Sequence, residues 1–97
     1  GGCHRLTLLS APGPPRELGA TISGRDVRLD WVNVGAASGF LLEVGFAPGR
    51  TDLRVFLGAD AHVTFAGVPS GTYFVRVTGG NEIGAGQPSS EIRVVVP

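Results

Sequence analysis

Acidic and basic side chains alternate in one short stretch, where Asp26, Arg28 and Asp30 occupy every second position. Two neighbouring carboxylates could serve as a general acid and a general base. Interleaving with an arginine is more typical of a solvated row of charges on the outer face of a strand. We therefore expect no acid–base catalysis from this stretch.

The other residue types that could carry catalysis or bind a metal are scattered along the sequence. His4 and His62 have no cysteine or carboxylate at the spacing of a zinc site. The serines lie in predicted loops, away from histidine, and form no nucleophile elbow. The glycine-rich stretch 79–86 is followed by no predicted helix, and the chain has no lysine, so a phosphate-binding loop is not expected. The sequence thus predicts a chain that is not an enzyme and that uses no cofactor or metal.

Cys3 is the only cysteine, so an internal disulfide is excluded and packing alone must hold the domain together. An incidental thiol, an intermolecular disulfide and a lipidated cysteine of a bacterial lipoprotein all remain open. Eight arginines balance eight acidic residues, which argues against a nucleic-acid partner. No apolar run approaches the roughly 20 residues that span a bilayer, so membrane insertion is not expected.

The 97 residues suffice for one domain. Sixteen glycines and seven prolines punctuate short apolar runs, which favours many strands joined by turns. Apolar residues recur with period two, and the predicted inward-facing sets are Leu18-Ala20-Ile22, Val27-Leu29-Trp31, Phe40-Leu42-Val44-Phe46, Leu53-Val55-Leu57, Val63-Phe65, Tyr73-Val75-Val77 and Ile92-Val94-Val96. Seven such strands predict an all-β fold, a seven-stranded antiparallel Greek-key β-sandwich.

From Pro12 to Pro97 the chain resembles a fibronectin type III domain. The motifs that carry the resemblance are, in chain order, "PGPPREL", "VRLDW", "GFLLEVGF" and "VPSGTYFVRVTGGNEIGAGQPSSEIRV". Phe40 stands where tyrosine is commoner, and Val68 replaces an expected leucine. The resemblance implies an immunoglobulin-like sandwich. It leaves residues 1–11 as an N-terminal arm or linker before a domain at 12–97.

Two aromatic residues are expected to be structural. Trp31 matches the tryptophan that the family buries from its second strand. Tyr73 follows a Pro-Ser-Gly turn, where the chain crosses between sheets. We expect its ring to pack in the core while its hydroxyl bonds a buried backbone group a few residues upstream.

The remaining candidate functional residues are apolar and are expected on the protein surface. Alternation together with the family's strand order predicts a protein-binding patch on the outer face of one sheet, made by Leu41, Phe56, Phe74 and Val95. The expected register aligns Gly45 with Phe74 and Val95, so that Phe74 covers the bare backbone of the glycine. It places Glu43, Arg76 and Arg93 together in the adjoining row. Scattered exposed hydrophobes are the alternative interpretation.

The resemblance implies a non-catalytic extracellular spacer or protein–protein interaction module of a secreted or cell-surface protein. Its partners would be another protein or neighbouring domains of the same chain. The lack of lysine suggests the codon bias of a bacterial source. Two alternatives remain open: a self-assembling filament or surface subunit joined through the arm or the outer sheet face, and an accessory domain of a secreted polysaccharide-degrading enzyme. The arm has strand character at Leu6 and Leu8, which suits pairing with a sheet edge.

Overall fold

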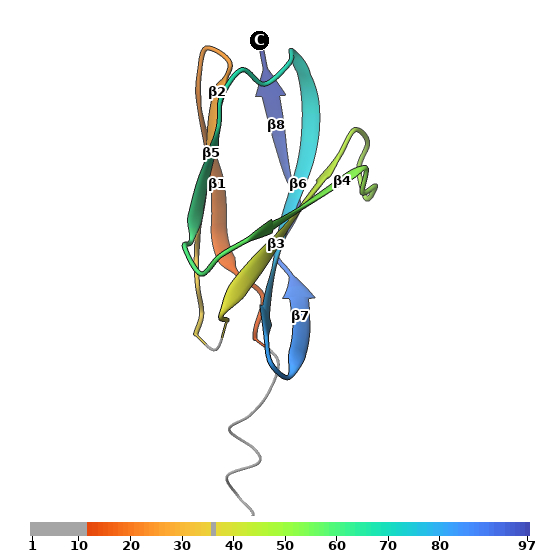
Figure 1. The fold of residues 1–97 in the computed structure, drawn as a ribbon. Coiled ribbons are helices and arrows are strands. Elements are labelled where there is room, and N and C mark those ends of the chain that lie inside the picture. The colour runs from red at the N-terminus through yellow and green to blue at the C-terminus, as the bar shows by residue number, and fades with distance from the viewer. Residues whose placement is uncertain (1–11, 36) are drawn as a thin grey trace, which may run out of the picture.

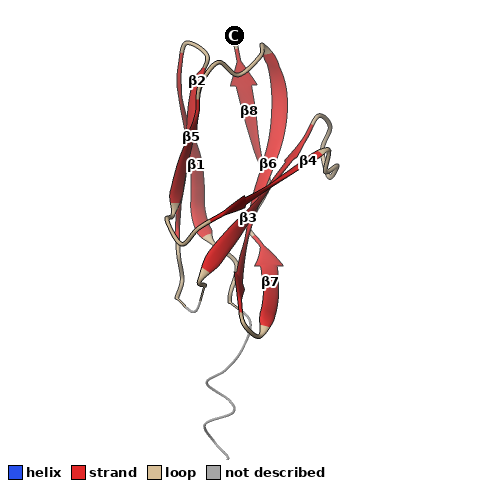
Figure 2. Cartoon of the chain, in the orientation of Figure 1, coloured by secondary structure: helices blue, strands red, loops and turns tan. Residues whose placement is uncertain are grey.

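Eight strands build the chain in a computed structural model that describes residues 12–35 and 37–97. The arm, with Cys3 and His4, lies outside the described residues. The strands are β1 (Arg16–Ser23), β2 (Asp26–Val32), β3 (Gly39–Gly45), β4 (Leu53–Leu57), β5 (His62–Phe65), β6 (Gly71–Asn81), β7 (Gly84–Pro88) and β8 (Ile92–Val96). Figure 2 shows strands joined by loops throughout the described part of the chain, where no helix is long and apolar enough to cross a membrane.

The strands form two antiparallel sheets. One sheet has three strands in the order β1-β2-β5; the other has the order β4-β3-β6-β7, with β8 also paired to β6. Figure 1 shows the two sheets facing each other as two layers. Consecutive strands β2 and β3, β4 and β5, and β5 and β6 lie in different sheets, so the chain crosses between the layers three times. The predicted all-β sandwich is confirmed.

The core lies between the layers and follows the predicted alternation. In β2 every second residue is buried and those between are exposed, because successive side chains point to opposite faces. The buried hydrophobic residues are Val27, Leu29, Trp31, Phe40, Leu42, Val75, Val77, Val94 and Val96. The rings of Trp31 and Phe40 meet edge to face across the two sheets, with centroids 5.3 Å apart. The inward faces of β2 and β8, and the centres of β3 and β6, were therefore predictable.

The expected count of seven strands was wrong by one. The segment Gly84–Pro88 is not among the strands predicted from alternation, because it is rich in glycine and ends in proline, but it pairs with the far half of the long strand β6. Asn81 holds the turn between them, since its Oδ1 accepts hydrogen bonds from the N–H groups of Ile83 and Gly84. β7 and β8 thus pair with successive halves of β6.

Ser89 joins these two halves. Its N–H donates to the carbonyl of Val77 at 2.8 Å, and its Oγ accepts from the N–H of Val77 at 3.0 Å. A side-chain oxygen therefore takes one place in the ladder where the strand is interrupted. Ser89 is buried, so the two bonds satisfy backbone groups of Val77 that are shielded from water.

The first strand departs from its predicted pattern. Leu18 packs against the core, but Ala20 and Ile22 are exposed, so alternation fails along β1. The register of β1 against β2 shifts between Arg16 and Gly19, and Glu17 has a positive φ of 55°. Such a bulge bends an edge strand, which a pattern of alternating residues does not reveal.

Candidate protein-binding surfaces

The four predicted binding residues lie on the outer side of the five-stranded sheet, but not in one cluster. Leu41 of β3 is directly opposite Phe56 of β4, and Phe56 is 83% exposed. Phe74 is half-buried and lies opposite Gly45, as predicted. Val95 lies opposite Thr72, two positions from its expected place. The structure therefore brings Leu41 and Phe56 together and leaves Phe74 and Val95 apart from them.

A row of charges separates the two groups. Glu43 lies between Arg54 and Arg76 in the paired strands, with nitrogen–oxygen distances of 3.6 and 3.7 Å. Arg76 also contacts the carboxylate of Glu91 at 3.3 Å. Arg93 was expected in this row, and that prediction was wrong, because it lies opposite Phe74. The register differs by two residues since β8 begins only after the interruption at Ser89.

Leu41 and Phe56 border a hollow that the β6–β7 hairpin closes on its other side. Its volume is about 420 Å³, and its floor includes Thr78, Gly80 and Ala85. Gly84 of the hairpin is exposed and lines the hollow, which therefore offers apolar side chains next to exposed backbone. We call Leu41, Phe56 and this hollow the Phe56 patch. Phe56 is the most exposed of the large hydrophobic residues among those described, and a partner could bury the whole ring.

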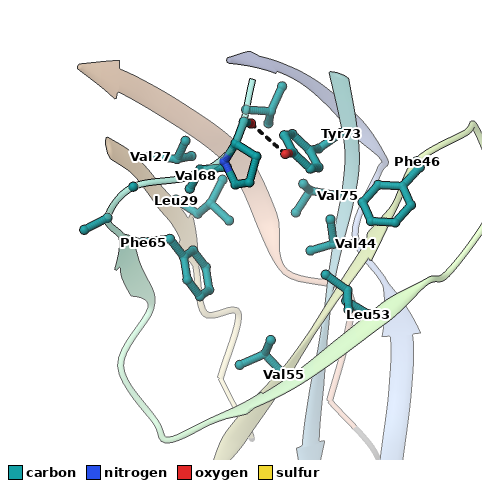
Figure 3. A pocket seen from close by; sticks show the side chains of 14 residues that line it. Val27, Leu29, Val44, Phe46, Leu53, Val55, Phe65, Val68, Tyr73 and Val75 are labelled. Atoms are coloured by element: carbon teal, nitrogen blue, oxygen red, sulfur yellow. Dashed lines mark hydrogen bonds between the residues drawn. The ribbon is translucent and has the colours of Figure 1, made fainter. Parts of the chain in front are cut away.

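A second hollow, which the sequence did not reveal, opens between the two sheets. Figure 3 shows it from close by, with side chains of β2, β3, β4 and β6 turned toward it. Its volume is about 360 Å³. Phe46 and Leu53, both predicted to face the core, line it and remain 54% and 53% exposed. We call it the inter-sheet pocket; its lining includes Leu53 and Val55 of β4 and Phe65 of β5, and each of these two strands lies at the end of its sheet.

Tyr73 lines the inter-sheet pocket and carries a polar contact there. Its hydroxyl donates to the carbonyl of Pro69 at 2.7 Å, four residues upstream (Figure 3). Its ring meets Phe46 edge to face at 5.9 Å. The sequence predicts a buried backbone acceptor for this hydroxyl, and that prediction is wrong. Pro69, which supplies the accepting carbonyl, is exposed. The hydrogen bond stabilises the turn before β6. Water can hydrate the carbonyl of Pro69 when this bond is absent.

Tyr73→Phe is therefore expected to lower the free energy of unfolding by only about 1 kcal/mol, the net value of one hydrogen bond. Tyr73→Leu, which also removes the ring contact with Phe46, should cost more. Urea denaturation followed by circular dichroism measures both. A loss above about 3 kcal/mol for the phenylalanine variant would contradict this account and indicate an acceptor that water cannot reach.

The charged residues of β2 make structural contacts. Arg28 and Asp30 lie 3.8 Å apart, with about half of each side chain exposed, and Asp26 accepts a hydrogen bond from the N–H of Gly67 at 3.3 Å. Residues 12–35 and 37–97 contain no cluster of three histidine, cysteine or acidic side chains that could hold a metal ion. Trp31 is buried, so it is not available to stack on a ligand.

Comparison with known proteins identifies the fold. No protein-family model and no curated relative matches the sequence. Among solved structures, an Fn3-like protein from Clostridium thermocellum superposes with a TM-score of 0.79 at 22% identity, over 91% of this chain and 96% of that one. The FN5 domain of Drosophila Lar gives 0.72 at 20% identity, over 90% and 98%.

Titin domains A168–A170 give a TM-score of 0.75 at 21% identity over 90% of this chain, which spans only 32% of that structure. These neighbours have the fibronectin type III fold, and so does this chain. Identities this low carry the fold alone.

Proposed function

We propose that this fibronectin type III-like sandwich is a non-catalytic protein–protein interaction module, or a spacer that contacts neighbouring domains through the same surface. The observation that carries the proposal is the exposure of Phe56, 83%, beside Leu41 and a hollow. Large aromatic residues next to a concavity are the usual anchors of protein interfaces. Phe56 has no structural reason to be aromatic within the described residues, since most of its surface meets solvent.

Charged residues border the Phe56 patch, as they commonly border the apolar centre of a protein interface. Arg54, Glu43 and Arg76 form paired contacts at 3.6 and 3.7 Å along one side of it. Of these three side chains only Arg54 is largely exposed, at 64%, whereas Glu43 and Arg76 are 16% and 20% exposed. Arg54 is therefore the charge that can orient a partner and disfavour wrongly placed charges. A partner that matches this surface would place an apolar side chain over Phe56 and polar groups over the row.

We further propose an extracellular or cell-surface setting in a bacterial protein. Its support is the resemblance of the sequence, the arginine-only basic composition and the fold shared with an Fn3-like protein from Clostridium thermocellum. Cell fractionation and protease treatment of intact cells test it. Protection from protease in intact cells would overturn it.

Phe56→Ser should lower recovery of the chain's protein partners about tenfold or more, because it removes the most exposed apolar side chain of the Phe56 patch. The measurement is chemical cross-linking of the purified chain to its flanking domains and to cell-envelope proteins, with quantification by mass spectrometry.

Val32→Ser is the matched control, since Val32 is an exposed apolar residue of the other sheet, 43% exposed. Both variants should keep the stability of the parent to within about 0.5 kcal/mol. Equal recovery by the two variants would contradict the proposal that Phe56 anchors the partner.

A further inference from the structure

β4 is an apolar edge strand without the usual protection against pairing. Its residues, Leu-Arg-Val-Phe-Leu, pair with β3 in an unbroken register from Leu53 to Leu57, with no bulge and no proline. It stands at the end of its sheet, so its other side presents unpaired backbone groups within the described part of the chain. Natural proteins commonly protect such strands with charges, prolines or bulges. β4 has one charge, Arg54, which already contacts Glu43.

Other strands at the margins of the sheets carry protection that β4 lacks. β1 has its bulge and the left-handed residue Glu17. β7 is rich in glycine and ends at Pro88. β5 is only four residues long, and β8 packs beside β1 on the far side of the sandwich. Among residues 12–35 and 37–97, β4 is therefore the edge best suited to accept another strand.

The inter-sheet pocket is an independent observation at the same place. Leu53 belongs to β4 and lines the pocket while 53% exposed; Val55 also lines it. A strand added to β4 would extend the inner apolar layer past these residues and cover part of the pocket's mouth. Pairing would therefore satisfy backbone groups and bury apolar surface together.

We propose that the β4 edge is an interface with a second copy of this chain, the two β4 strands pairing antiparallel about a two-fold axis at Val55. In that register Val55 faces its own counterpart, and Leu53 faces Leu57 of the second copy on the inner face. On the outer face Arg54 lies opposite Phe56 of the second copy, where a cation–π contact forms. The interface is isologous, as a two-fold axis requires.

Neighbouring registers are less favourable. A shift must be by two residues to keep inner side chains on the inner face. One shift places Arg54 opposite Arg54 of the second copy, and like charges directly opposite are destabilising. That register pairs only Leu53 to Val55, and the other pairs only Val55 to Leu57, so each leaves three residue rows within the strand against five about Val55. Charge and length thus both favour the register about Val55.

This inference goes beyond the proposed function, because it names a second copy as partner and depends on the strand edge and the inner residues of β4. Phe56 also belongs to the Phe56 patch, so the association is tested at Leu53 and the register at Val55, with Phe56→Cys only as the comparison variant in cross-linking. A five-residue edge is smaller than the roughly 1,200–2,000 Å² of stable interfaces, so the dimer should dissociate on dilution.

Sedimentation equilibrium of the 97-residue chain tests the association. The average mass should rise with concentration from that of one chain toward that of two. Leu53→Lys should weaken dimerisation about tenfold or more, because it places a charge in the inner apolar row. Ile83→Lys is the matched control, since Ile83 is 52% exposed on the β6–β7 turn. A constant monomer mass overturns the proposal, as does association that Leu53→Lys leaves unchanged.

Cross-linking tests the register in a Cys3→Ser background. Val55→Cys brings two thiols together on the two-fold axis, where opposite Cα atoms are about 4.5–5.5 Å apart and a disulfide can form. Phe56→Cys is more exposed, but its two copies are diagonal neighbours about 7–8 Å apart, beyond easy bridging. Faster disulfide formation by Val55→Cys is expected. Equal or faster formation by Phe56→Cys overturns the register.

Discussion

Replacing Trp31 with alanine is expected to lower the free energy of unfolding by about 4 kcal/mol, in the range found for large aromatic residues in cores. Trp31 is 5% exposed and meets Phe40 edge to face at 5.3 Å, so its removal leaves a cavity between the two sheets. A domain of this size has only about 5–15 kcal/mol of stability. The variant should therefore unfold at a much lower urea concentration.

Circular dichroism is the appropriate probe, because Trp31 is the only tryptophan and its fluorescence is lost in the variant. Trp31→Phe is the informative control. It keeps an aromatic ring near Phe40, and it removes the indole N–H, which is buried with no hydrogen-bond partner among the described residues. Its cost should be well below that of alanine. A loss below about 1 kcal/mol for Trp31→Ala would mean that the sheets collapse into the space.

Strands in the middle of the sheets were the most predictable part of this fold. In β2, buried Val27, Leu29 and Trp31 alternate with exposed charges, because one face packs on the core and the other meets water. The same constraint makes Leu42 and Val77 the most buried large side chains. Where both the backbone ladder and one face are fixed by neighbours, period-two alternation is a reliable guide.

Edges were less predictable, because their environment depends on distant parts of the chain. Leu53 has the alternation of a core residue, yet it is half exposed because the layer opposite β4 leaves the inter-sheet pocket open. Gly84–Pro88 has a loop composition, yet it forms a strand because the far half of β6 offers it a partner. Local sequence cannot report either condition.

Some residues of the candidate site were placed correctly from the sequence and others were not. Leu41 and Phe56 were placed on one face by alternation, and adjacent strands brought them together. Val95 and Arg93 were misplaced by two residues, because the interruption at Ser89 sets the register of β8. The charged row that divides the surface could therefore not be drawn correctly from the sequence.

Gly45→Ala is expected to lower the free energy of unfolding by about 3 kcal/mol, the upper end of the usual cost of overpacking. Gly45 is buried at the end of β3, opposite Phe74. A methyl group there would collide with the backbone carbonyl of Arg50, in the loop that leads to β4. The glycine is thus required by that loop as it folds back over the strand, rather than by the ring of Phe74.

The loop cannot easily move aside. Asp52 donates its N–H to the carbonyl of Val44 at 2.9 Å, and its carboxylate accepts from the N–H of Phe46 at 2.8 Å. Gly58→Ala is the matched control for urea denaturation, since a Cβ there meets no atom within 4 Å. Gly58→Ala should change the free energy of unfolding by less than about 1 kcal/mol. The change should be stabilising, because alanine reduces the conformational entropy of the unfolded chain. Equal stability of the two variants would contradict a rigid loop. Because this loop leads directly to Leu53, its displacement should also weaken pairing at the β4 edge, which links the stability of the turn to the association of the chain.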